Sequence, residues 1–71
     1  MTFKEIMNNT GQQERGLVIA AIISDGVAPS TAYAWCSGAR RPRLLYQMQI
    51  QKHVKRILGL SVPLAEMFPE K

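Results

Sequence analysis

The sequence predicts an all-α fold, a small bundle of four to five helices in one domain that spans residues 1–71. Apolar residues recur at intervals of three and four, and capping and glycine signals divide the chain into short segments. A domain of this size buries only about 60% of its unfolded surface, so partner binding or self-association would matter to its stability.

The first helix is expected to begin after Thr2 and to end at residues 8–9. Thr2 and Glu5 have the spacing of a capping box, in which hydroxyl and carboxylate each accept the other residue's backbone N–H. An apolar stripe typical of a core-facing helix follows, formed by Phe3, Ile6 and Met7.

The second helix is predicted from residue 11 or 12 to residue 24, with a capping box of Thr10 and Gln13 at its start. The apolar run 17–23 is equally typical of a buried strand, but the start signal and the Ser-Asp-Gly ending favour a helix. Gly16 costs about 1 kcal/mol relative to Ala in a helix interior. Either a neighbour approaches closely there, or the helix begins later.

Residues 26–42 have the pattern of a tight turn, a short helix and a basic exit loop. Gly26 can adopt the left-handed conformation that ends a helix, and Val27 follows as an apolar plug. Pro29 suits the first turn of a new helix, because its missing N–H would have no partner there. Gly38 is expected to end this helix.

The short helix has an apolar and a polar side. Ala32 and Trp35 are three residues apart and are expected to face inward, with Trp35 as an anchor in the core. Ser30, Tyr33 and Ala34 then lie on faces that can point outward.

Pro42 is expected to open a fourth helix that runs to Gly59. Residues 45–50 alternate apolar and polar side chains as a half-buried strand would, so a strand is the alternative for this segment. The good helix formers in it favour the helix. The apolar residues at helical spacing are Leu44, Met48, Ile50, Val54, Ile57 and Leu58.

A last helical turn is predicted after Ser61, which would cap it, with Pro63 in its first positions. Its apolar residues, Leu64, Met67 and Phe68, would cover the core or form a dimer patch.

Residues 26–42 resemble the helix-turn-helix of the lambda-repressor-like (Cro/repressor, Xre) family of DNA-binding domains. Members often show Gly-Val, a short Ser/Thr-rich helix, a bulky apolar residue, Gly and a basic loop ending in Pro. The residues at the corresponding positions of this sequence are Gly26-Val27, Ser30-Thr31, Trp35, Gly38 and Arg40-Arg41-Pro42. Two features depart from the pattern: Ala28 replaces the usual Ser or Thr cap, and the helix has no Gln, Asn or Arg at the common base-reading positions.

The resemblance implies a sequence-specific transcriptional regulator of bacterial or phage type, which lays the 29–37 helix in the major groove of double-stranded DNA. A homodimer on two half-sites is expected, because one short helix offers few base contacts. The expected base-reading residues are Ser30, Tyr33, Pro29 and Ala34, with contact of Tyr33 to phosphate alone as the alternative. The expected phosphate-binding residues are Thr31, Ser37, Arg40, Arg41 and Arg43.

The charge distribution favours a nucleic-acid partner. The net charge is +4, and all five acidic residues lie outside residues 26–65. That span has a positive field of the kind that meets phosphate. Its six cations are Arg40, Arg41, Arg43, Lys52, Lys55 and Arg56.

No enzyme activity, cofactor, metal site or small-molecule substrate is expected. One His and one Cys cannot supply a zinc site alone, and no third group is evident to orient a Cys–His pair. His53 is interpreted as a solvated or phosphate-near side chain and Cys36 as a small helix residue. The single cysteine fits a reducing, cytoplasmic location, and the apolar run 17–23 is far shorter than the roughly 20 residues that span a membrane.

A small helical protein-interaction module is the alternative function. Such a module would dock through the apolar C-terminal residues Leu64, Met67 and Phe68. Binding to phosphate weakens steeply as salt rises, whereas apolar docking persists, so salt dependence separates the two functions.

Overall fold

The computed structural model describes residues 1–69, and within that range it contains five helices and no strand. The helices are α1 (Phe3–Asn8), α2 (Gln12–Ser24), α3 (Pro29–Ser37), α4 (Leu44–Leu58) and α5 (Leu64–Met67). The all-α prediction is confirmed, and the alternative of a strand over residues 45–50 is wrong.

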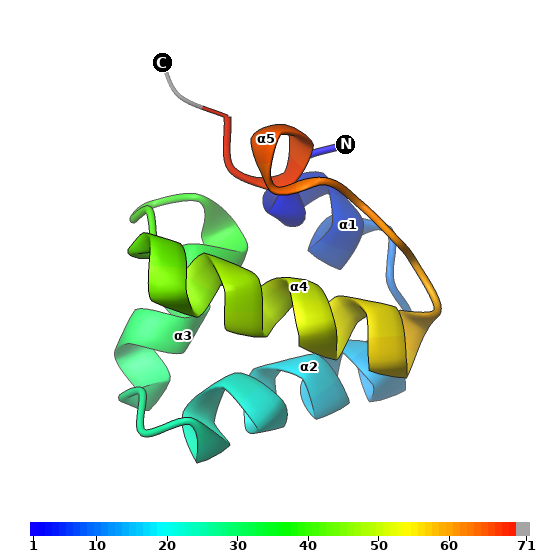
Figure 1. The fold of residues 1–71 in the computed structure, drawn as a ribbon. Helices are drawn as coiled ribbons and strands as arrows, with labels where there is room; N and C mark the ends of the chain where they lie inside the picture. The colour runs from blue at the N-terminus through cyan, green and yellow to red at the C-terminus, as the bar shows by residue number, and fades with distance from the viewer. Residues whose placement is uncertain (70–71) are drawn as a thin grey trace.

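The long helices α2 and α4 pack against each other, and α3 contacts both α1 and α2. In the view of Figure 1, α4 lies between α2 and α5, with α3 at one end of the α2–α4 pair. None of the described helices is long and apolar enough to span a membrane.

The core draws on all five helices, and two aromatic pairs tie distant segments together. The ring centroids of Phe3 and Phe68 are 5.6 Å apart, and those of Trp35 and Tyr46 are 5.3 Å apart. Each large apolar side chain that is fully buried stabilises the fold by about 1.5 to 3 kcal/mol. The buried apolar residues are Phe3, Ile6, Met7, Val18, Ile19, Ile22, Val27, Ala32, Trp35, Cys36, Ile50, Val54, Met67 and Phe68.

The capping box predicted at α1 is confirmed. The Thr2 N–H donates to Oε1 of Glu5 at 2.9 Å, and the Glu5 N–H donates to Oγ1 of Thr2 at 3.2 Å. The hydrogen bonds from Thr2 lower the pKa of the Glu5 carboxyl.

The capping box predicted at the start of α2 is wrong. The Thr10 hydroxyl donates back to the Ile6 carbonyl of α1 at 2.6 Å, and Gly11 caps α2 without a side-chain hydrogen bond. The last carbonyls of a helix lack partners in their own helix, and the Thr10 hydroxyl satisfies one of them.

Two explanations were offered for a glycine at position 16, a later start of the helix or a close neighbour. Gly16 lies inside α2, so the first explanation is wrong. The other explanation, a close neighbour, is also wrong, because a Cβ added at Gly16 would meet no atom within 4 Å. Gly16 is exposed to solvent, and nothing in the structure requires a glycine there.

The start of α4 differs from the prediction. The helix begins at Leu44 with Arg43 as its N-cap, two residues after the predicted start at Pro42. The Gln47 N–H donates to the Arg43 carbonyl at 2.9 Å, and the Gln47 side chain donates from Nε2 to the Pro42 carbonyl at 2.8 Å. Pro42 therefore supports the first turn of α4 from outside it.

Two of the apolar residues at helical spacing along α4 are exposed. Leu44 is 63% exposed and Met48 is 46% exposed, and their neighbour Leu45 is 65% exposed. Helical spacing alone did not distinguish the two sides, because apolar residues occur on both.

The final turn begins at Leu64 with Pro63 as its N-cap and without a side-chain cap, so the predicted cap at Ser61 is wrong. Met67 and Phe68 are buried and Leu64 packs against the core. The prediction that this segment covers the core is confirmed.

Candidate nucleic-acid interface

A four-residue turn joins α2 to α3 and reverses the chain at Gly26. The N–H groups of Asp25 and Gly26 donate to the carbonyls of Ile22 and Ile23 at 3.1 and 3.0 Å, which ends α2. Gly26 has φ 93°, in the left-handed region that favours glycine, and the next residue, Val27, is buried. The predicted turn is therefore confirmed.

Both ends of α3 follow the predicted pattern. Pro29 occupies the first turn, and Ala28 before it makes no side-chain cap. Gly38 ends the helix with φ 80° in a Schellman motif, in which the Ala39 N–H donates to the Ala34 carbonyl at 2.9 Å. The chain turns sharply here, so the loop that follows leaves from the C-terminal end of α3.

The two sides of α3 differ strongly in exposure. Ala32 is fully buried and Trp35 is 8% exposed, as predicted, and Cys36 is buried beside them. Ser30, Tyr33 and Ser37 are exposed, and their i, i+3, i+7 spacing places them along one stripe of the helix. We call these three residues the α3 stripe.

The other candidate residues of α3 flank this stripe. Pro29 is exposed at the N-terminal end, while Thr31 and Ala34 are half-buried at the sides. The Ser37 hydroxyl donates to the Ala34 carbonyl at 3.1 Å within the helix. The α3 stripe therefore carries most of the polar surface that the helix offers to a partner.

The basic loop, residues 39–43, carries the three arginines assigned to phosphate, and all three are exposed. Arg40 and Arg43 make no side-chain hydrogen bond within residues 1–69. Nη2 of Arg41 donates to the Phe68 carbonyl at 3.0 Å, which ties the loop to the segment after α5. No local sequence pattern indicates this bond, because it joins residues 27 positions apart.

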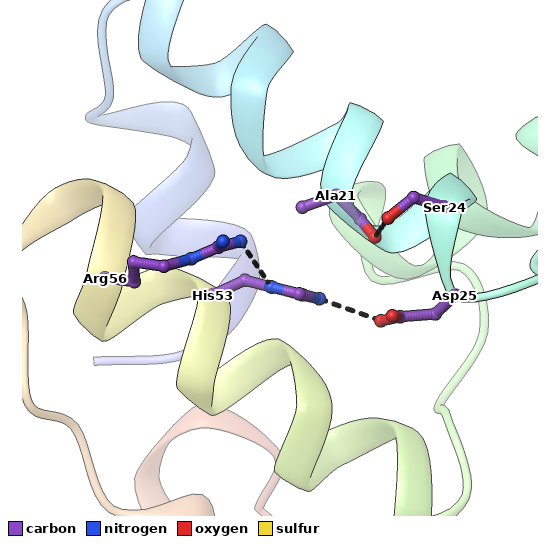
Figure 2. A network of polar contacts seen from close by, with 5 residues as sticks. All are labelled: Ala21, Ser24, Asp25, His53 and Arg56. Carbon is purple, nitrogen blue, oxygen red and sulfur yellow. Dashed lines mark hydrogen bonds and ion pairs between the residues drawn. The ribbon is translucent and has the colours of Figure 1, made fainter.

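A second polar network, which the sequence interpretation missed, links the turn to α4 (Figure 2). Nε2 of His53 lies 2.8 Å from Oδ2 of Asp25, and Nδ1 of His53 lies 3.0 Å from Nη2 of Arg56. The His53 side chain is only 13% exposed. The interpretation of His53 as a solvated side chain is therefore wrong, and its nearness to phosphate stays a prediction.

The network fixes the protonation pattern of the imidazole. A guanidinium can only donate, so Nδ1 of His53 accepts from Arg56 and carries no proton. The ring proton then lies on Nε2, which donates to the Asp25 carboxylate. The imidazole contacts both partners and connects α4 to Asp25, the C-cap of α2.

The Cys36 thiol lies in the core rather than at the surface. Burial raises its pKa to about 11, against a smaller opposing effect of the charge on Arg15. A thiol with this pKa stays protonated near neutral pH, and the thiolate is the nucleophilic form. Among residues 1–69, no group of three His, Cys, Asp or Glu side chains gathers in a way that could hold a metal ion.

The structure thus brings the predicted residues onto two adjoining surfaces, the α3 stripe and the basic loop. No family model, curated protein or solved structure matches this sequence.

Proposed function

We propose that this chain is a sequence-specific DNA-binding transcriptional regulator of bacterial or phage type. The observation that carries the proposal is the α3 stripe, which lies on the side of α3 opposite its buried residues and leads directly into the basic loop. A short helix with an exposed polar side, next to cations, suits entry into a major groove bordered by phosphates.

Each part of this surface has a distinct role in the proposal. Ser30 and Tyr33 contact base edges through their hydroxyls, and carbon atoms of Pro29 and Ala34 meet thymine methyl groups. Contacts to phosphate position the helix without reading sequence. The phosphate contacts are assigned to Thr31, Ser37, Arg40, Arg41 and Arg43.

The regulator is further proposed to act as a homodimer in the cytoplasm. Two copies on half-sites about one helical turn apart would double the few base contacts that one α3 can make. The exposed side chains of Leu44, Leu45 and Met48 offer apolar surface for such an association.

Selection of binding sites from a random duplex library tests the proposal. The expected result is enrichment of an inverted repeat, which would establish DNA binding and the dimer geometry together. Recovery of sequences no different from the starting pool would contradict sequence-specific binding.

A protein-interaction module is the second candidate function, and the exposure of Leu44, Leu45 and Met48 favours it. The C-terminal residues Met67 and Phe68 are buried and would not be available to a partner in this fold. Docking through the exposed patch on α4 would persist at high salt, whereas phosphate-dominated binding would be lost.

A further inference from the structure

A groove of about 590 Å³ lies where the start of α1, the chain leaving α3 and the segment after α5 meet. These three segments are far apart in sequence. Their charged members are Lys4 from α1 and Arg40 and Arg41 from the basic loop. Among the described residues that line the groove, none is acidic.

The Lys4 side chain lies across the beginning of this loop. A Cβ added at Gly38 would lie 3.2 Å from Cδ of Lys4, so the methylene chain of Lys4 covers the position where α3 ends. Lys4 also lines the same groove as Arg40 and Arg41 of the basic loop. Lys4 is exposed and makes no side-chain hydrogen bond or ion pair within residues 1–69.

The other side of the groove is held in place by Arg41. Its hydrogen bond to the Phe68 carbonyl joins the loop to the C-terminal wall of the groove. Phe3, Trp35 and Phe68 are buried and also line the groove, so part of its wall is apolar. Low-dielectric walls beneath like charges focus their field, so the groove attracts an anion more strongly than scattered surface cations would.

We propose that Lys4 is a further phosphate-binding residue and that this groove receives a phosphodiester of the DNA backbone. The proposal rests on the proposed function and extends its phosphate contacts from the basic loop to α1. A DNA phosphate is the occupant because the groove is rimmed by Arg40 and Arg41, which leave the C-terminal end of the α3 stripe. A free inorganic phosphate shares this chemistry, and the experiment separates the two.

The test compares Lys4→Met with the matched control Lys55→Met. Methionine keeps an aliphatic chain over Gly38 and removes the charge, and Lys55 is an exposed lysine on α4 that does not line the groove. Affinity for a short duplex of random sequence is measured between about 50 and 200 mM salt. Lys4→Met should lower the log–log salt slope by about 1, while Lys4→Arg and Lys55→Met should retain the slope of the parent.

The outcomes separate this inference from the function on which it rests. If the parent binds duplex and Lys4→Met keeps the parent's slope, the role of Lys4 is wrong while the proposed function stands. If the parent binds no duplex even at low salt, the proposed function fails and the role of Lys4 fails with it.

Amide chemical shifts of the parent provide a readout that needs no variant. Titration with the duplex should move the amide signals of Lys4, Gly38 and Ala39, and inorganic phosphate alone at the same ionic strength should leave them in place. Equal shifts with inorganic phosphate would overturn the assignment to DNA, and no shift with the duplex would overturn the groove as a site.

Discussion

The helices α3 and α4 expose very different surfaces although both bury an apolar side. On α3 the exposed stripe is polar apart from the ring of Tyr33, and the large apolar residue Trp35 is buried. On α4 the exposed side begins with Leu44, Leu45 and Met48 and continues with cations. Exposure therefore follows hydropathy on α3 but not at the start of α4, and each helix has an outer surface suited to a different contact.

The largest expected effect concerns the buried side of α3. Trp35→Ala should lower the free energy of unfolding by roughly 3 to 5 kcal/mol, because it empties a large volume in the core and removes the contact with Tyr46. Leu45→Ala on the exposed side of α4 is the control and should change it by less than about 0.5 kcal/mol. Urea unfolding measures both, and equal midpoints for Trp35→Ala and the parent would contradict the burial of Trp35.

The basic loop should carry the main phosphate contacts of the proposed interface. Each change of Arg40, Arg41 or Arg43 to Ala should weaken binding on all sequences and lower the log–log salt slope by about 1. Arg41→Ala should also lower stability, because its bond to the Phe68 carbonyl is lost. A triple variant with the parent's affinity and salt slope would show that the loop does not clamp phosphate.

Sequence reading should depend on the α3 stripe. Ser30→Ala and Tyr33→Ala should each relax the preference at one or two base pairs per half-site, by about 1 kcal/mol or more. Binding to a panel of single-base site variants measures this preference. Equal loss of affinity on every site would assign both residues to positioning of the helix and not to base contacts.

Gly16→Ala should stabilise the scaffold helix α2 by about 1 kcal/mol, because alanine is the better helix former. The added methyl group meets no atom within 4 Å and the backbone is helical, so it introduces no strain. Urea unfolding of the variant measures the gain. A loss of stability would mean that Gly16 has a close neighbour, contrary to the structure.

The smallest effect should come from the pair that joins α4 to the turn before α3. A double-mutant cycle with Asp25→Ala and His53→Ala should give a coupling energy of about 0.5 kcal/mol, because the pair is partly exposed. Nitrogen chemical shifts of the imidazole should show the proton on Nε2. A proton on Nδ1 would be incompatible with the hydrogen bond from Arg56.

Local signals predicted the parts of the fold that depend on neighbouring residues. The capping box of Thr2 and Glu5, the left-handed turn at Gly26 and the ends of α3 each depend on a few adjacent positions, and all are confirmed. The errors at Thr10, Pro42 and Ser61 share one cause. At each, a residue typical of helix starts stands near the helix, but a different residue is the N-cap: Gly11 for α2, Arg43 for α4 and Pro63 for α5.

The candidate site was predictable only in part, for the same reason. The residues of α3 and the basic loop are contiguous, so one pattern located them together. Asp25 and His53 are 28 positions apart, and Lys4 reaches Gly38 only after α1 has packed against α3. The spacing of residues within a helix or turn does not indicate contacts between residues so far apart in the sequence.

The hydrogen bond from Gln47 to Pro42 couples the basic loop to the first turn of α4. The Pro42 carbonyl has its side-chain partner only while the first turn of α4 is formed, because that turn holds the Gln47 amide within hydrogen-bond distance of the carbonyl. Opening of that first turn would free the Pro42 end of the loop, while the bond from Arg41 to the Phe68 carbonyl would still hold its middle. Local opening at the start of α4 should therefore be felt first at Pro42 and Arg43.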